Sequence, residues 1–395
     1  MRGQTLVTNA FIKIPEGLAE EIARGPYPTQ RLKRRDRPTT YVGSNIKPVD
    51  ERESGFNRAL RGEFGPKAQK GRPRFVMKAP VSAALGQMQE YLIPVVDGPL
   101  APEKAPIPGD PKILSRHIKA IAYFLKADMV GVCRLPRYAI YTHDKDGNPV
   151  TLNHQNAIAI LIDQDFMTYN GSTGYDWITN ANSFHAYSLS GFIAVNIANY
   201  IRRLGYPARA HHARNYQVVV PPILLWTGLG EMCRIGGIVL NPFLGPRFKA
   251  AVVTTDLPLE PDLPIDIGLQ DYCDRCQKCS RECPSKAISK GEKVIYNDYE
   301  LWMYDVEACT KFRVLNSKGA GCGHCIKVCP WNKPYKSYHK PIEWLVERSR
   351  LARRITIFFD DLLGYGKPVP KDKWWFDLEE VDGRLQIPLD SLRNE

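Results

Sequence analysis

CDRCQKCSRECP (273–284) and CGHCIKVCP (322–330) contain seven of the ten cysteines of this 395-residue chain. Three closely spaced cysteines, followed by a fourth cysteine and a proline, are typical of the bacterial ferredoxin type of [4Fe–4S] binding. In that pattern the fourth cysteine of a run ligates the other cluster. The two runs therefore predict two [4Fe–4S] clusters within one short block of the chain.

The spacing also assigns each cysteine to a cluster. We expect the first cluster to be held by Cys273, Cys276, Cys279 and Cys329, and the second by Cys283, Cys309, Cys322 and Cys325. Zinc has no need of the C-x2-C-x2-C triplet, and a disulfide framework is typical of small secreted chains. Cys133 and Cys233 lie in apolar stretches, which favours inert core residues over ligands.

The charge of the chain is strongly positive, with a formal net charge of +12. Each [4Fe–4S]²⁺ core with four thiolates carries about −2, so two clusters lower the total to about +8. Much of the surplus lies in residues 31–74, a run that could bind nucleic acid or an acidic protein, or form a solvated arm. We expect no nucleic-acid partner; an acidic ferredoxin or flavodoxin would suit a basic face.

The chain shows no apolar run near the ~18 residues that span a bilayer. Its start, MRGQTLVTNAF, lacks the apolar core of a secretory signal. We therefore expect no transmembrane segment and a cytoplasmic location, although a processed exported chain would look the same.

The pattern of elements predicts four regions. Residues 1–110 form a basic, Pro/Gly-rich wrapping region, 111–265 an α/β domain, 266–335 the ferredoxin-like module, and 336–395 a segment that packs on the core. Helical spacing over 113–125 and 351–359 predicts helices, and a long helix is expected over 183–204 with Ser183 as its N-cap. Strands are expected at 129–135, 157–163, 216–220 and 249–257. The fold class is α+β.

Most of the chain lies outside the cysteine block, so the clusters are expected to deliver electrons to chemistry in the upstream domain. No G-x-G-x-x-G opens a helix after a strand, which argues against a Rossmann nucleotide site. No Walker motif and no D-x-H-x-x-G pattern for a cobalt-ligating histidine is present.

Upstream motifs extend the interpretation. The runs AYSLSGFIAVNIANYIRRLGYPARAHH (186–212), GLGEMCRIG (228–236) and NPFLGPRFKAAVVTTDLPLEPDLPID (241–266), followed by the cysteine runs, resemble the corrinoid-dependent reductive dehalogenases. The resemblance implies a nitroreductase-like core that holds a base-off cobamide, with a ferredoxin-like module beside it. It also implies an oxidoreductase that cleaves carbon–halogen bonds in an organohalide substrate, with electrons from an external low-potential donor.

The same resemblance implies roles for individual residues. Tyr187 matches the proton-donating tyrosine, with Tyr175 as the fallback, and Asn215 matches a residue that orients substrate or halide. Because phenol has a pKa near 10, a nearby cation must favour phenolate, and Arg247 and Lys249 are the candidates. The first cluster is expected to lie nearer the corrin. A core tyrosine at 187 and a surface ion pair at 247 are the alternative interpretations.

Two other functions stay open. Epoxyqueuosine reductase, which acts on tRNA, shares the cobamide, both clusters and the TDLxLEPD stretch. However, it typically reads GLGWIGK where this chain reads GLGEMCR, and the tail here is too short for its helical-repeat domain. A non-catalytic iron–sulfur electron-transfer protein is the other alternative. The particular organohalide, the physiological donor and the oligomeric state cannot be read from the sequence.

Overall fold

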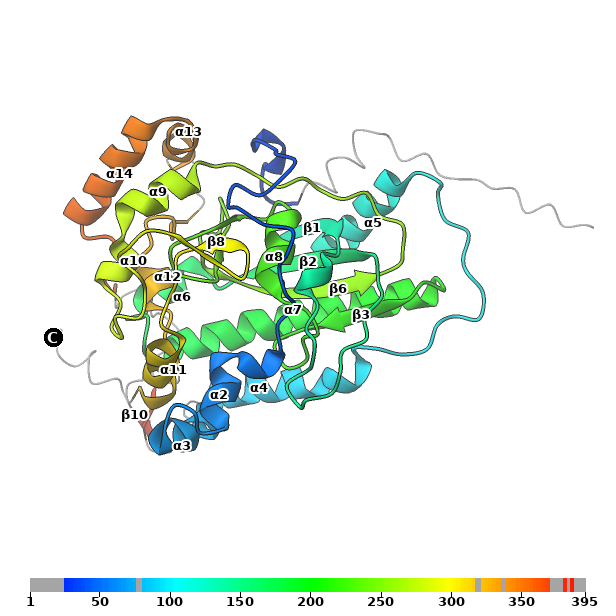
Figure 1. Cartoon of the computed structure of the whole chain (residues 1–395), viewed down its shortest axis with the longest axis horizontal. Coiled ribbons are helices and arrows are strands. Elements are labelled where there is room, and N and C mark those ends of the chain that lie inside the picture. The colour runs from blue at the N-terminus through cyan, green and yellow to red at the C-terminus, as the bar shows by residue number, and fades with distance from the viewer. Residues whose placement is uncertain are drawn as a thin grey trace, which may run out of the picture.

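The computed structural model describes residues 25–75, 80–316, 321–334, 339–369, 379–381 and 384–386. Its centre is a four-stranded antiparallel sheet in the order β1-β2-β6-β3 (Figure 1). The strands are β1 (Met129–Arg134), β2 (Asn156–Asp163), β6 (Phe248–Thr255) and β3 (Ala208–His211). Three of the four predicted strands are thereby confirmed.

The fourth predicted strand, 216–220, is wrong. Val218 forms only an isolated bridge to Ile140, and Val220 begins helix α8 (Val220–Trp226). Pro221 and Pro222 occupy the first turn of α8, where a missing backbone N–H costs nothing. The apolar run is therefore a short buried helix.

Both faces of the sheet are covered. On β2, Ile158, Ile160 and Ile162 pack with α5 (Pro111–Phe124) and α7 (Trp177–Arg203), whereas Ala157, Ala159 and Leu161 belong to the core shared with α8 and the cysteine block. This two-sided burial explains the continuous apolar strands. The sheet thus holds the long helix on one side and the cysteine block on the other.

Helix α7 is longer than predicted. Its N-cap is Asp176, whose carboxylate accepts a hydrogen bond from the backbone N–H of Thr179, and Ser183 lies inside the helix. The predicted end is confirmed, since Gly205 follows with a φ of 81°. The extra turns carry residues that line the pocket described below.

Among its described residues, the predicted wrapping region contains the helices α2 (Gly55–Leu60), α3 (Pro66–Arg74) and α4 (Pro80–Tyr91). The first two pack against α11 (Val306–Leu315), and α4 packs along α7 (Figure 1). Short helices take most of their stability from such tertiary contacts, so their sequence periodicity is weak. Single-turn 3-10 helices are η1 (Thr29–Arg31), η2 (Glu51–Glu53), η3 (Ile93–Val95) and η4 (Arg137–Ala139).

The cysteine block is a set of short elements. They are α9 (Leu269–Cys276), α10 (Lys278–Arg281), β7 (Val294–Tyr296), β8 (Tyr299–Leu301), α11 and α12 (His324–Lys327). A small hairpin of β4 (Glu231–Met232) and β5 (Val239–Leu240) precedes the block in the chain. Further upstream, the short helix α6 (Phe166–Gly171) follows β2.

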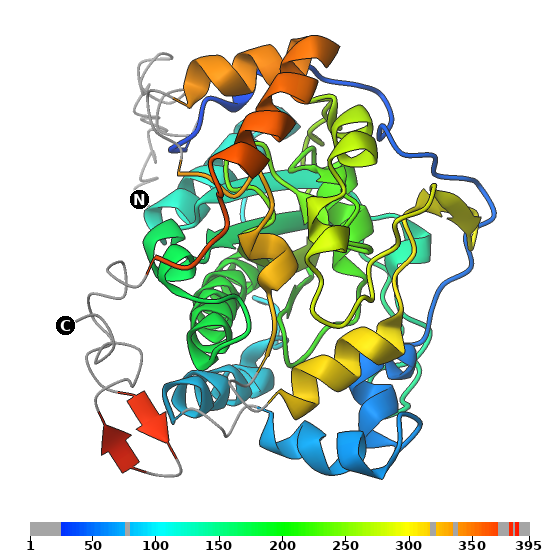
Figure 2. The same ribbon diagram turned by 90° about the vertical axis from the view of Figure 1, so that its left-hand side faces the viewer.

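The C-terminal region begins with α13 (Lys340–Arg348) and α14 (Arg350–Leu362), which lie over α9 at the outside of the molecule (Figure 2). Helix α14 confirms the helix predicted at 351–359. A small hairpin of β9 (Glu379–Val381) and β10 (Arg384–Gln386) follows. Parts of the predicted regions 1–110 and 336–395 lie outside the described residues. None of the helices in the described ranges is long and apolar enough to cross a membrane.

Candidate iron–sulfur and substrate site

The cysteines of the block lie close to one another in the fold. Beyond burial, the largest cause, the thiols of Cys273, Cys276 and Cys279 raise the pKa of Cys329. The pKa of Cys325 is likewise raised, first by burial and then by the thiols of Cys322, Cys279, Cys309 and Cys283. The fold therefore brings Cys329 to the first triplet, and brings Cys283 and Cys309 to Cys322 and Cys325.

The first thiol group surrounds a cavity of about 320 Å³. Its four cysteines line the cavity together with Tyr272 and Trp331. Burial raises the pKa of all four thiols, so thiolates there need a compensating cation such as cluster iron. The donor set fits a cubane cluster. Within the described ranges, no three or more His, Cys, Asp or Glu side chains are placed closely enough to hold a single metal ion.

Cys233 lines the same cavity and is 1% exposed, as Cys133 is 2% exposed on the sheet. The predicted core position of both is confirmed. Burial raises the pKa of both thiols above the usual value.

Close backbone approaches hold the second group. A Cβ on Gly323, between Cys322 and His324, would lie 1.9 Å from the hydroxyl oxygen of Tyr169. The Tyr169 hydroxyl donates a hydrogen bond to the Gly323 carbonyl, and the Gly323 N–H donates to Gly174. Only glycine lets the CGHC turn pack against α6, which places Cys322 beside α7.

A pocket of about 740 Å³ joins the second thiol group to α7. Thr179, Ser183 and Tyr187 line it at a four-residue spacing, which puts them on one face of the helix. Lys249, near the start of β6, and Cys322 complete this part of the wall. We call this cavity the Tyr187 pocket.

Tyr187 and Lys249 are neighbours in it. The ammonium of Lys249 lies 5.2 Å from the centre of the Tyr187 ring. Burial raises the pKa of Tyr187, and Arg313 opposes that shift. Burial, then Arg313, lowers the pKa of Lys249 to about 8, while Cys325 raises it. The pocket therefore places a cation against the face of a buried phenol ring.

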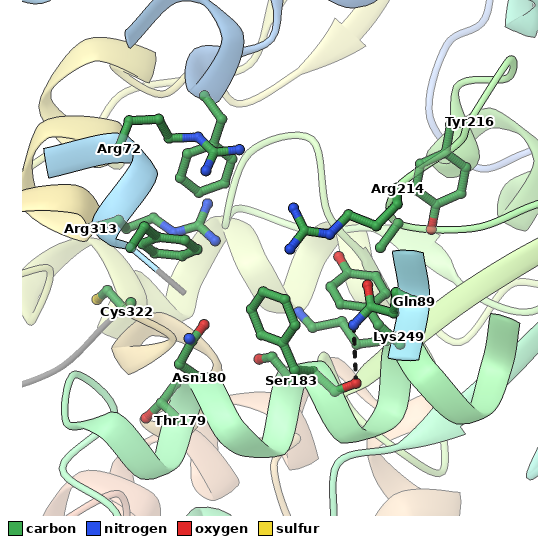
Figure 3. A pocket seen from close by; sticks show the side chains of 16 residues that line it. Arg72, Gln89, Thr179, Asn180, Ser183, Arg214, Tyr216, Lys249, Arg313 and Cys322 are labelled. Atoms are coloured by element: carbon green, nitrogen blue, oxygen red, sulfur yellow. Dashed lines mark hydrogen bonds between the residues drawn. The ribbon is translucent and has the colours of Figure 1, made fainter. Parts of the chain in front are cut away.

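Three arginines extend from different parts of the chain toward the same pocket (Figure 3). Arg72 lies over the Phe56 ring at 4.9 Å, Arg313 over the same ring at 4.3 Å, and Arg214 over Phe184 at 5.7 Å. The lining residues that the structure describes include no carboxylate. Burial, then Arg214 and Arg313, lowers the pKa of Arg72 to about 10.

These arginines are only partly neutralised. Arg214 Nε lies 3.1 Å from a Glu90 carboxylate oxygen. The Nε atoms of Arg72 and Arg313 are buried and have no hydrogen-bond partner within the described ranges. Uncompensated buried cations favour an anionic ligand.

Arg247 was one of the two cations expected beside Tyr187, and the structure does not place it in the Tyr187 pocket. Arg247 is 2% exposed, and its guanidinium donates to both oxygens of Asp163, at 2.7 and 3.0 Å, and to Asn332 at 2.6 Å. It is neither a surface ion pair nor a pocket residue. Instead, it ties the end of β2 to the segment after Cys329.

Asn215 and Tyr175 also lie off the pocket wall. The Asn215 amide oxygen accepts a hydrogen bond from Arg209, whereas its neighbours Arg214 and Tyr216 line the pocket. Tyr175 contacts the rings of Phe312 and His324. Of the residues predicted for catalysis, the structure places only Tyr187 and Lys249 in the Tyr187 pocket.

Of the two thiol groups, the second is the one that reaches this pocket. Cys322, which lines the pocket, and Cys325, which influences Lys249, both belong to the second group. The first group lies next to Tyr272 and Trp331. The spacing within each cysteine run fixes ligand grouping but carries no information on which group faces α7.

Sequence reasoning missed the arginines and Asn180. Arg313 follows Cys309 by one helical turn, a signal that could have drawn attention to it. Arg72 lies in the basic run that was open to a nucleic-acid or solvated-arm interpretation. No local pattern links residues 72, 214 and 313, because only the tertiary fold brings them together.

By its fold and site, the protein is a mixed α/β iron–sulfur protein with a basic pocket beside one thiol group. A family model described as a 4Fe-4S double cluster binding domain matches residues 272–332. The tetrachloroethene reductive dehalogenase of Sulfurospirillum multivorans is 29% identical over 65% of this chain and 58% of its own length. The chain is thus similar to a reductive dehalogenase over about two thirds of its length.

A solved structure of a reductive dehalogenase is also similar to this chain. The catabolic reductive dehalogenase NpRdhA, in complex with 3-bromo-4-hydroxybenzoic acid, is 41% identical with a TM-score of 0.89, covering 94% of this chain and 55% of that one. This chain therefore spans little more than half the length of these relatives. The epoxyqueuosine reductase of Atelocyanobacterium thalassa is 34% identical over only 28% of this chain.

Proposed function

We propose that this protein is a cobamide-dependent reductive dehalogenase, which replaces the halogen of an organohalide by hydrogen. The observation that carries the proposal is one pocket that joins Tyr187, Lys249 and Cys322 in a chain similar to reductive dehalogenases. A proton donor, a cation and an electron source are the three parts that the reaction needs from the protein.

One residue at the pocket fits a corrinoid. Its rim carries amide groups, and the Asn180 amide nitrogen at the pocket is buried without a hydrogen-bond partner in the described ranges. A solved relative, 41% identical, is described in the context of B12-dependent dehalogenation. When bound, the corrinoid supplies the low-valent cobalt chemistry that breaks the carbon–halogen bond. We also propose that the 111–265 core is nitroreductase-like.

Tyr187 is proposed as the proton donor to carbon. Burial raises the pKa of its phenol, so the hydroxyl keeps its proton at neutral pH until a basic carbon develops beside it. Lys249 and Arg313 then favour the phenolate, because each is a cation that lies close enough to influence the site. Of the two candidate cations, Arg247 and Lys249, we propose Lys249 as the one that favours the Tyr187 phenolate.

The reaction consumes two electrons and one proton, and it yields R–H and a halide ion from R–X. An external low-potential donor is proposed to supply the electrons, which pass through the two clusters. The second thiol group is the one that reaches the Tyr187 pocket, since Cys322 lines it.

The pocket favours an aromatic organohalide that carries a negative charge. Phe56, Phe75 and Phe184 provide apolar faces, and the guanidinium groups of Arg72, Arg214 and Arg313 provide cations (Figure 3). Halogenated hydroxybenzoates combine both properties, and one occupies the relative NpRdhA. We propose this class as the first to test.

The test is anaerobic halide release by protein loaded with iron, sulfide and cobalamin and reduced with a viologen. Halogenated hydroxybenzoates should release halide faster than chlorinated alkenes. Absence of halide from halophenols, hydroxybenzoates and alkenes, with no corrinoid retained, would refute the proposal. Turnover of epoxyqueuosine-containing tRNA instead would select the tRNA-modifying alternative.

A further inference from the structure

The outward surface of α13 and α14 carries many large apolar side chains, although both helices are rich in charge. Two charged side chains of α14 turn inward: Arg353 donates to Asp271 at 3.0 Å, and Asp360 accepts from Lys278 at 2.6 Å and Lys333 at 2.8 Å. Buried charges together with exposed apolar side chains are unusual on a surface helix.

We call the exposed surface the α13–α14 face and define it by its large apolar side chains. These are 46–66% exposed and comprise Trp344, Leu351, Ile355, Phe358, Leu362 and Leu363. Figure 2 shows both helices at the outside of the molecule. A contiguous group of this kind marks an interaction surface, since scattered single residues are the norm on soluble proteins.

The α13–α14 face lies directly over the first thiol group. A groove between the two helices is lined on its inner side by Tyr272 and Trp331. The same two side chains line the cavity that Cys273, Cys276, Cys279 and Cys329 surround. One layer of aromatic side chains therefore separates the groove from the first cluster position.

The two thiol groups have different surroundings. The second group reaches the Tyr187 pocket through Cys322, whereas the first is adjacent to the α13–α14 face. If electrons end at the pocket, they must enter at the first group. This step rests on the proposed function.

Charge decides between the possible occupants. Arg348, Arg350 and Arg354 are exposed on the same two helices, and Arg348 pairs with Glu347 at 3.0 Å. The formal net charge is +12, or about +8 with two clusters. A second copy would bring the same arginines and the same positive charge against them, which is unfavourable. An acidic partner would be attracted and oriented. An apolar centre with a charged rim is also the ordinary anatomy of a transient protein interface.

We propose that the α13–α14 face is the docking surface for an acidic, low-potential electron-transfer protein. In each encounter the carrier is oxidised by one electron and the first cluster is reduced by one. Two encounters supply the two electrons of one carbon–halogen cleavage.

The experiment uses the cluster-loaded protein and an acidic two-cluster bacterial ferredoxin as the probe. Binding is measured by calorimetry at low and high salt, and cluster reduction by the pre-reduced ferredoxin is followed by stopped-flow spectroscopy. The test variants are Phe358→Ser and the charge reversal Arg350→Glu/Arg354→Glu. Matched controls on α5 are Phe124→Ser, at an 81% exposed residue, and Arg116→Glu.

Both test variants should weaken ferredoxin binding by about tenfold and slow cluster reduction, with the salt dependence reduced in the charge reversal. The α5 controls should behave as wild type. Halide release driven by reduced methyl viologen should be unchanged in every variant, because a small reductant needs no docking surface.

Three results would overturn the proposal. Wild-type protein could fail to bind both this ferredoxin and an acidic flavodoxin, the test variants could bind as wild type does, or Phe358→Ser could abolish a dimer of the wild-type chain. Absence of viologen-driven halide release from the wild-type protein would instead count against the proposed function. The binding measurement would still test whether the ferredoxin docks on the α13–α14 face.

Discussion

A tyrosine that gives up its proton must survive briefly as phenolate, and the Tyr187 pocket provides cations for that state. Tyr187→Phe removes only the hydroxyl and should lower kcat for halide release by about 10²–10⁴, the usual contribution of a positioned acid. Cluster signals in electron paramagnetic resonance should be unchanged.

Tyr175→Phe is the matched control, because Tyr175 contacts Phe312 and His324 outside the pocket wall. This variant should keep wild-type turnover. Full activity in Tyr187→Phe together with loss in Tyr175→Phe would transfer the proton-donor role to Tyr175.

Lys249 predicts a pH dependence. Its pKa is lowered by burial to about 8, so the ammonium that favours phenolate is present below pH 8 and is lost above it. Turnover should therefore fall as pH rises through about 8. In Lys249→Arg the cation persists to much higher pH, so this decline should disappear from the pH–rate profile. The same decline in both proteins would exclude Lys249 as its origin.

Arg72 should affect charged substrates selectively. Arg72→Gln removes one buried cation whose Nε has no hydrogen-bond partner in the described ranges. The KM for 3-bromo-4-hydroxybenzoate should rise about tenfold, in keeping with the loss of one charged hydrogen bond, while the KM for neutral 2-bromophenol changes little. Equal changes for both substrates would show that Arg72 shapes the pocket without recognising charge.

At the scale of single elements, the charged inner side of α14 holds that helix on the cysteine block. Asp360 is 5% exposed and pairs with Lys278 and Lys333. Asp360→Ala leaves two lysine ammonium groups without their shared carboxylate, so it should lower the free energy of unfolding by about 3–5 kcal/mol. Anaerobic urea unfolding of the cluster-loaded protein measures this.

The neighbouring Asp361→Ala serves as the comparison. Asp361 has a 42% exposed side chain, pairs with Arg281 at 2.6 Å and lies 3.5 Å from Lys278, which keeps its closer partner Asp360. Its loss should therefore cost about 1 kcal/mol or less. Similar losses in the two variants would mean that α14 is not held by its inner charges.

The elements also show where sequence reasoning works. Helix α14 and strands β1, β2 and β6 follow from local periodicity, and the structure confirms them. The start of α7 was misplaced because Asp176 and Ser183 are both good N-cap residues, and only the tertiary contacts of residues 177–182 select the first. Helices α2 and α3 escaped prediction because their stability comes from packing on α11.

At the scale of the whole molecule, the fold joins two parts that the sequence treats separately. The presence of two [4Fe–4S] clusters was predictable, since short spacings fix which thiols one loop can present. The position of the second group at the Tyr187 pocket was not, because it depends on how the CGHC turn packs against α6. The convergence of Arg72, Arg214 and Arg313 likewise depends on three distant segments.

The central claim is that electrons from the clusters and a proton from Tyr187 replace a halogen by hydrogen. The most direct test incubates the cluster- and corrinoid-loaded protein with 3-bromo-4-hydroxybenzoic acid and reduced viologen, and measures bromide, 4-hydroxybenzoic acid and viologen oxidation together. The account predicts one bromide and one 4-hydroxybenzoic acid for every two viologen radicals oxidised. Viologen oxidation with no bromide, or bromide release that needs no reductant, would contradict it.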